Sequence, residues 1–193
     1  MKEIIVATGN QNKVREIREM LPGYRVRTVD EVCPGLEIIE NGKTFEENAV
    51  IKARTVCDQV NRLTLADDSG LVIDYLNGEP GIYSARYLGH DTPYEEKNRI
   101  ILERMRAARG MARSARFICA IAIAWPDGRN EVFRGVFEGR IAEMPAGEGG
   151  FGYDPIFYVP EFGMTAAEMS PARKNACSHR GRALRSVAEH LGL

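Results

Sequence analysis

An apolar run at 115–125 constrains the fold of this chain more than any other stretch of the sequence. Apolar side chains occupy both alternating sides of it: Phe117, Cys119, Ile121 and Ile123 on one, Ile118, Ala120, Ala122 and Ala124 on the other. A strand that is apolar on both faces is typical of the covered centre of an α/β sheet. The turn sequence Pro126–Arg129 then reverses the chain into 132–141 as an antiparallel hairpin, so we expect a mixed sheet.

Strand-like and helix-like segments alternate around this central strand. Apolar spacing predicts strands at 4–7, 24–29 and 63–66, and helices at 14–21, 45–60, 93–110 and 170–191. Thr44 and Glu47, like Thr92 and Glu95, have the spacing of capping boxes that open two of these helices. A chain of 193 residues can bury a core without cross-links. We therefore expect a single α/β domain over residues 1–193.

The charge balance and the cysteines limit the classes of partner and compartment. The 26 basic and 27 acidic residues give a net charge of -1, so no overall positive field attracts nucleic acid. No segment approaches membrane-spanning length and no leader precedes the first strand, so we expect a cytoplasmic protein without a membrane partner. The four cysteines match no zinc spacing and are expected to be free thiols.

Two adjacent acids interrupt the apolar run that begins at Leu63. Turns prefer residues such as Asp67, Asp68 and the Ser-Gly pair that follows them, so the first interpretation is a turn between two strands. Neighbouring carboxylates repel each other unless a cation lies near, and a turn does not need the second charge. The alternative is that Asp67 and Asp68 bind a metal ion or act in catalysis.

Two positions in the first half of the chain could meet an anion. Lys13 falls in the first turn of a helix, where its charge opposes the helix dipole unless an anion such as phosphate binds there. Asn48 and Lys52 lie four residues apart on the second helix, so they could reach one phosphate together. In both cases the alternative is a side chain that simply faces solvent. The spacing of a Walker loop is absent.

A glycine-rich segment and a basic helix form the second informative region. Glycines at 147–152 let backbone N–H groups approach a ligand, and Phe151 and Tyr153 offer faces on which a base could stack. The alternative for Phe151 is core packing. The last helix carries Lys174, His179 and Arg180 on a basic face, which could instead be solvated.

Six segments follow the order and spacing of one known family: ATGNQNKVREI, TFEENAVIKA, LADDSGLVID, GEPGIYSARY, GGFGYDPIF and KNACSHRGRAL. On these segments the chain resembles the inosine triphosphate pyrophosphatase family of Ham1/RdgB type, in its bacterial branch. The resemblance implies a long, mixed, twisted β-sheet with flanking helices that form two lobes around a central cleft, and a homodimer. It also implies Mg²⁺-dependent hydrolysis of dITP, ITP and XTP to the monophosphate and pyrophosphate, which cleanses the nucleotide pool.

The resemblance assigns roles to individual residues. Asp68 matches the catalytic acid and, with Glu40, the Mg²⁺ ligands, although Glu37 could serve in place of Glu40. The role of Asp67 stays open. The sequence departs from the family at Ala172-Arg173, where Glu-Glu is common. The matched substrate-binding residues are Thr8, Gly9, Asn10, Gln11, Asn12, Lys13, Lys52, Ser69, Phe151, Gly152, Tyr153, Asp154, Lys174, His179 and Arg180.

These residue types suit the implied chemistry. Lysines and Mg²⁺ would neutralise charge on the phosphates, while Asp68 would deprotonate a water for attack on the α-phosphorus. His179, Arg180 and the backbone N–H groups of residues 151–154 would donate to the C6 carbonyl of hypoxanthine or xanthine. Two alternatives are a Maf-like pyrophosphatase for modified or canonical nucleotides and a nucleotide-binding sensor without turnover. A haloacid-type phosphatase is disfavoured, because its two aspartates are separated by one residue.

Overall fold

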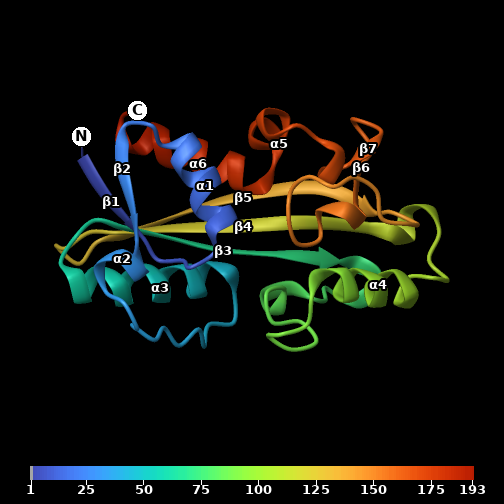
Figure 1. Ribbon diagram of the computed structural model, residues 1–193, viewed down its shortest axis with the longest axis horizontal. Coiled ribbons are helices and arrows are strands. Elements are labelled where there is room, and N and C mark those ends of the chain that lie inside the picture. The colour runs from blue at the N-terminus through green and yellow to red at the C-terminus, as the bar shows by residue number, and fades with distance from the viewer. Residues whose placement is uncertain (1) are drawn as a thin grey trace. The chain divides into compact units, whose positions relative to one another are not determined.

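The computed structural model describes residues 2–193. Their strands form one seven-stranded sheet in the order β2-β1-β3-β4-β5-β6-β7 (Figure 1). β1 runs parallel to β2 and β3, whereas β6 runs antiparallel to β5 and β7, so the predicted mixed sheet is confirmed. The strands are β1 (Lys2–Val6), β2 (Tyr24–Thr28), β3 (Thr64–Ile73), β4 (Ser114–Ala124), β5 (Asn130–Ile141), β6 (Phe157–Val159) and β7 (Met164–Thr165).

Helices lie between successive strands from β1 to β4, and the α/β class is confirmed. They are α1 (Gln11–Met20), α2 (Val29–Val32), α3 (Phe45–Val60), α4 (Tyr94–Arg104), α5 (Pro171–Cys177) and α6 (His179–Leu191). Within residues 2–193, none of them is both long and apolar enough to cross a membrane. All four cysteines are free thiols, as predicted.

The chain divides into two compact units. The first unit comprises residues 1–69, 119–135 and 179–193, and the second comprises 70–118 and 136–178. Each unit has its own hydrophobic core, built around Leu65 and Ile121 in the first unit and around Ile73 and Phe157 in the second. The cleft between two lobes of a single domain stays a prediction.

Helices cover both faces of the sheet in the first unit. α1 and α6 lie side by side on one face, and α3 lies on the other (Figure 1). The central strand β4 is buried along nearly its whole length, as its apolar pattern requires. α6 adds Ala183, Leu184 and Val187 to the core that Ile4 and Val6 of β1 also line.

The predicted helix over 170–191 is wrong, because the chain forms two helices there. α5 ends at Cys177, Ser178 takes an extended conformation with ψ 162°, and α6 begins at His179. Serine in that conformation is typical of the residue that precedes a helix, so Ser178 starts a new helix instead of continuing the first. Lys174 therefore belongs to the second unit, and His179 to the first.

Of the two predicted capping boxes, the one at Thr44 forms in part and the one at Thr92 does not form. Thr44 accepts a hydrogen bond from the Glu47 backbone N–H at 3.1 Å, but the Glu47 carboxylate accepts from the Lys43 N–H. Thr92 does not cap α4: its hydroxyl donates to the Leu88 carbonyl, and the helix begins after Pro93. α4 also ends at Arg104, earlier than the predicted boundary near residue 110.

Replacing Gly135 by alanine is expected to destabilise the protein by about 1–3 kcal/mol. An added Cβ on β5 would meet the backbone carbonyl of His179 and the N–H of Ala183, which cannot move aside without displacing α6. Urea unfolding measures the loss. Gly23→Ala is the matched control, because its Cβ would meet only the Leu193 side chain, and equal losses in the two variants would contradict the prediction.

Candidate functional site

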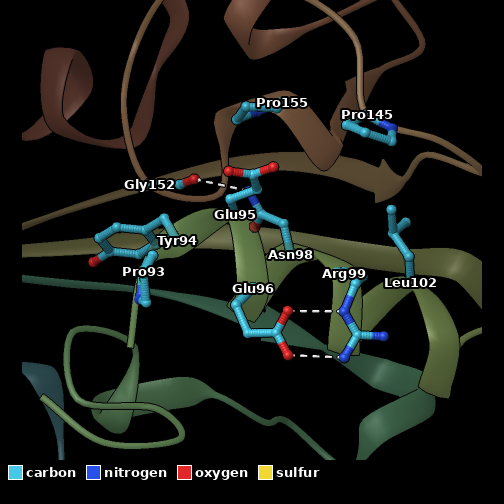
Figure 2. Close-up of a pocket in the computed structure, with 10 residues that line it drawn as sticks. All are labelled: Pro93, Tyr94, Glu95, Glu96, Asn98, Arg99, Leu102, Pro145, Gly152 and Pro155. Atoms are coloured by element: carbon cyan, nitrogen blue, oxygen red, sulfur yellow. Dashed lines mark hydrogen bonds and ion pairs between the residues drawn. The ribbon is translucent and has the colours of Figure 1, made fainter. Parts of the chain in front are cut away.

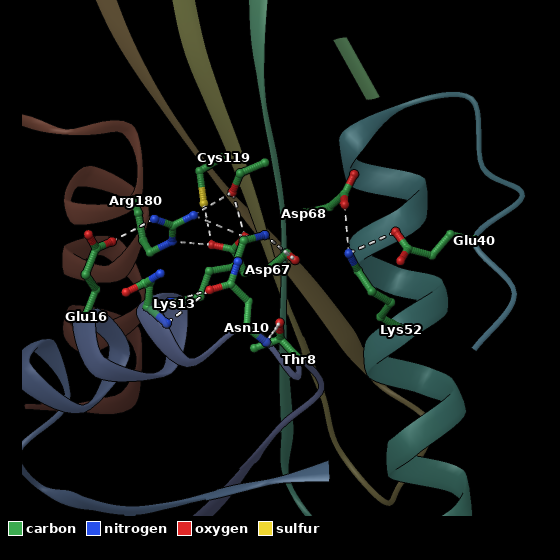
Figure 3. A network of polar contacts seen from close by, with 12 residues as sticks. Thr8, Asn10, Lys13, Glu16, Glu40, Lys52, Asp67, Asp68, Cys119 and Arg180 are labelled. Atoms are coloured by element: carbon green, nitrogen blue, oxygen red, sulfur yellow. Dashed lines mark hydrogen bonds and ion pairs between the residues drawn. The ribbon is translucent and has the colours of Figure 1, made fainter. Parts of the chain in front are cut away.

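The acidic pair lies inside a continuous strand, so the predicted turn at 67–70 is wrong. β3 runs from Thr64 to Ile73 without a break. Successive side chains of a strand point to opposite faces, and this alternation separates the two neighbouring carboxylates. Asp67 points towards α1 and α6, whereas Asp68 points towards α3 (Figure 3). Each carboxylate meets cations on its own face, which is why the strand tolerates both charges.

Asp67 is the centre of a buried ion cluster on the first face. Its carboxylate lies 2.5 Å from Lys13 Nζ and 2.7 Å from Arg180 Nε, and accepts further bonds from Ser69 Oγ at 2.6 Å and Cys119 Sγ at 3.2 Å. Burial alone would raise the pKa of Asp67, but the two cations outweigh burial and hold that pKa well below its ordinary range. Asp67 is therefore a fixed anion.

Arg180 is a buried partner of carboxylates. Its guanidinium, 2% exposed, donates to Asp67, to Glu16 Oε2 at 2.7 Å and to Ser69 Oγ at 3.2 Å. Because Arg180 is buried and bonded to carboxylates, the alternative that it faces solvent is wrong. Its predicted role in reading the base stays a prediction.

Glu16 and Cys119 belong to the cluster, but sequence reasoning missed both. Glu16 lies one helical turn after Lys13 on α1, so the two side chains are neighbours on the helix surface. This spacing was the only sign in the sequence that Glu16 belongs to the same cluster, and it is a weak one. Cys119 sits in an apolar strand and carries no local signal. Burial, followed by the charge of Asp67, raises the pKa of the Cys119 thiol well above its ordinary range, so it acts as a donor.

Asp68 and Glu40 share one ammonium on the second face. Lys52 Nζ of α3 lies 2.7 Å from Asp68 Oδ1 and 3.0 Å from Glu40 Oε2. Burial alone would lower the pKa of Lys52, but the two carboxylates outweigh it and raise that pKa. Burial raises the pKa of Asp68 in spite of the lysine. Asp68 Oδ2 is buried and has no hydrogen-bond partner within residues 2–193.

The start of α3 places Glu40 beside Lys52. The Gly42 N–H donates to Asn48 Oδ1 at 2.9 Å, and a Cβ at position 42 would collide with the backbone of the helix. The fully buried Asn48 thus holds the acidic segment against the helix, so its predicted solvent-facing alternative is wrong. Glu37 is exposed, which favours Glu40 as the carboxylate next to Asp68.

The segment Thr8–Lys13 forms the junction between β1 and α1. Asn10 is the N-cap, and its side chain accepts from the N–H groups of Asn12 and Lys13 at 3.0 and 3.3 Å. Thr8 Oγ1 accepts from the Asn10 N–H, and the Gln11 side chain donates to the Gly9 carbonyl. Asn10 therefore takes two of the donors that a phosphate would use, and the anion next to Lys13 is Asp67.

A second cluster lies in the second unit. Asp154 Oδ2 accepts from the Phe151 N–H at 2.8 Å and from Lys174 Nζ at 2.6 Å. The same ammonium lies 4.7 Å from the centre of the Phe151 ring. The Tyr153 ring is buried, and its hydroxyl donates to the Ser84 carbonyl at 2.7 Å. The 151–154 loop and Lys174 are therefore brought together.

The glycines before this loop serve close packing. A Cβ at Gly147 or Gly149 would collide with the backbone of Ala167, and the Gly149 N–H donates to the Ala167 carbonyl at 2.9 Å. In the loop itself, the Phe151 and Asp154 N–H groups bond to acceptors within the loop. Two of the four N–H groups of residues 151–154 therefore have acceptors inside the loop, and the predicted reading of a base by this loop stays a prediction.

The predicted site residues thus fall into three groups. Two lie in the first unit: Lys13, Ser69 and Arg180 meet Asp67 on one face of β3, and Lys52 meets Asp68 and Glu40 on the other. His179 is buried at the start of α6. The third group contains the 151–154 loop and Lys174 in the second unit. β3 thus carries two acids on opposite faces, and each acid is held by a lysine.

Comparison with known proteins identifies the family. A sequence model of the Ham1 family matches residues 4–190, so the chain belongs to the Ham1 family. It is 49% identical over 189 residues to a dITP/XTP pyrophosphatase of Thermus thermophilus, covering 97% of this chain and 90% of that protein. A dITP/XTP pyrophosphatase of Bacillus anthracis is 44% identical, with 99% and 96% covered. The solved structure of a HAM1 protein from Coxiella burnetii superposes with a TM-score of 0.90 at 44% identity, covering 99% and 98%.

Asp67→Asn is expected to lower the free energy of unfolding by about 3 kcal/mol or more. The amide keeps the shape of the carboxylate but leaves the buried Arg180 and the Lys13 ammonium without their shared anion. Urea unfolding in the absence of nucleotide measures the change. Asp127→Asn removes an exposed carboxylate paired with Arg129 and should leave stability unaltered. An Asp67→Asn variant as stable as this control would contradict the structural role.

Proposed function

We propose that this protein hydrolyses non-canonical purine nucleoside triphosphates, namely dITP, ITP and XTP, to the monophosphate and pyrophosphate. Two lines support the proposal. The relatives from Thermus thermophilus and Bacillus anthracis, which match nearly the full chain, are named dITP/XTP pyrophosphatases. In the first unit, the Asp68 carboxylate is also buried, beside Lys52 and close to the second acid Glu40.

One observation carries the proposal: Lys52 holds Asp68 Oδ1, while Oδ2 is buried without a hydrogen-bond partner within residues 2–193. A buried acceptor left unsatisfied costs free energy unless a ligand completes it. In the proposed reaction Asp68 orients a water and accepts its proton. The water oxygen bonds to the α-phosphorus, the bond from that phosphorus to the bridging oxygen breaks, and pyrophosphate leaves.

The carboxylates of Asp68 and Glu40 fit Mg²⁺, which takes oxygen ligands and keeps waters and substrate phosphates in its shell. The carboxylates of Asp68 and Glu40 would hold the ion. Residues 2–193 contain no group of three or more His, Cys, Asp or Glu side chains placed to hold a metal. When bound, the ion supplies Lewis-acid polarisation of a phosphoryl oxygen. Lys52 adds a fixed positive charge next to the same carboxylates.

Asp68→Asn is expected to lower kcat/KM for ITP at least about 100-fold, because the amide cannot accept a proton from water. Folding should be retained, since Asn is nearly isosteric with Asp. Pyrophosphate release measures the turnover, and thermal unfolding checks the fold. Asp127→Asn, an exposed aspartate on the 126–129 turn, should keep wild-type turnover. Asp68→Asn turnover within about tenfold of wild type is too high for the loss of a general base.

The product and the base preference test the reaction class. In ¹⁸O-water, label should enter the monophosphate, and pyrophosphate should be the other product. Hypoxanthine and xanthine carry a C6 carbonyl where adenine carries an amino group, so kcat/KM for ITP and XTP should exceed that for ATP by orders of magnitude. Label in orthophosphate would overturn the mechanism. Preferred turnover of canonical nucleotides would favour the Maf-like alternative, and binding without turnover would favour a sensor.

The proposal includes a setting and an assembly. The four free thiols agree with a reducing compartment, and we place the activity in the cytoplasm. We also propose a homodimer, on the family resemblance alone. Sedimentation at micromolar concentration gives the mass, and a monomer at all concentrations would remove this part of the proposal.

A further inference from the structure

A pocket lies beside the 151–154 loop, wholly within the second unit (Figure 2). Its volume is about 570 Å³. Tyr94, Asn98 and Leu102, spaced one helical turn apart on α4, line one wall, and Gly152 and Pro155 lie opposite. α4 is therefore the element that supports the loop from this side.

Asn98 connects the helix to the loop directly. Its Nδ2 donates to the Gly152 carbonyl at 3.1 Å, and the residue is only 6% exposed. Gly152 has φ +69°, a conformation that other residues rarely adopt. Asn98 Oδ1 is buried and has no hydrogen-bond partner in the described part of the chain, so the Gly152 carbonyl alone fixes the orientation of this amide.

Tyr94 contacts the same loop one turn earlier. Its ring meets that of Tyr153 edge to face, with 5.2 Å between the ring centres. Lys97 Nζ lies 4.8 Å from the centre of the Tyr94 ring and donates to the Ala85 carbonyl at 2.7 Å. Tyr94 thus packs against the residue next to Gly152, while Asn98 binds the backbone of Gly152 itself.

Other bonds join residues of the loop to one another and to α5. The Phe151 and Asp154 N–H groups bond within the loop, and the Asp154 carboxylate binds Lys174 of α5. These bonds set the shape of the loop. The Asn98 bond ties that shape to a rigid helix, which is how supporting residues hold a binding loop in place.

We propose that Asn98 is a positioning residue, which holds the 151–154 loop in its substrate-binding conformation through the Gly152 carbonyl. This inference rests on the proposed function, because it takes the loop to contact the nucleotide. Without the bond, the loop occupies other conformations, and part of the binding free energy is used to order the loop again. The cost appears in the binding of the substrate, while the chemistry at Asp68 is unchanged.

Steady-state kinetics with ITP test the proposal in Asn98→Ala and in Asn98→Asp, which keeps the shape but loses the donor. Loss of one such bond should raise KM about tenfold, with kcat within about threefold of wild type. Leu102→Ala is the matched control: Leu102 lines the same pocket and packs on the core of the second unit, so its loss lowers stability without removing a bond to the loop. Its KM should equal that of the wild type.

Hydrogen–deuterium exchange separates this inference from the proposed function, because it needs no substrate. Amides at 150–154 should exchange faster in Asn98→Ala than in Leu102→Ala. An unchanged KM in Asn98→Ala, or an equal rise in Leu102→Ala, would overturn the positioning role. If wild-type protein fails to hydrolyse ITP, the proposed function fails, while the exchange experiment still decides whether Asn98 holds the loop.

Discussion

The charge balance at Asp67 is the interaction on which the first unit depends. A carboxylate that is almost wholly buried is costly unless cations meet it. Lys13 comes from α1 and Arg180 from α6, so the same anion holds two helices against the centre of β3. Arg180 in turn brings Glu16 into the cluster. Removing any one charge leaves an uncompensated ion inside the protein.

The alternation of side chains along β3 gives the two neighbouring acids different surroundings. Because Asp67 faces α1 and α6, its neighbour Asp68 must face α3, where Lys52 and Glu40 lie. The surroundings push the pKa values of the two carboxyls in opposite directions, down for Asp67 and up for Asp68. One acid is a fixed anion of the fold, and the other keeps an oxygen for a ligand.

The sequence predicts the parts of the fold that local periodicity determines. The apolar run at 115–125 predicted the buried strand β4. The spacing of Phe45, Ala49 and Ala53 predicted the buried face of α3. Motif resemblance placed Asp68, Glu40 and Lys52 in one site, and their side chains do meet. These signals are either periodic or made of several residues in a fixed order.

Long-range pairing explains what the sequence could not predict. Asp67-Asp68 has the composition of a turn, and the cations that keep it in a strand lie 54 and 113 residues away at Lys13 and Arg180. No local pattern reports such partners. Ser178 likewise reads as part of one basic helix, although its extended backbone separates two helices that belong to different units.

The placement of α6 has a consequence for how the protein is made. Synthesis delivers the chain from its first residue onward, so residues 70–178, which supply the whole second unit, emerge before α6 does. The first unit receives Ala183, Leu184 and Val187 of its core only when that helix appears. Arg180 also lies on α6. Until α6 has been synthesised, Lys13 is the one cation of the cluster that can pair with the Asp67 carboxylate. The first unit can therefore be completed only after every residue of the second unit has been synthesised.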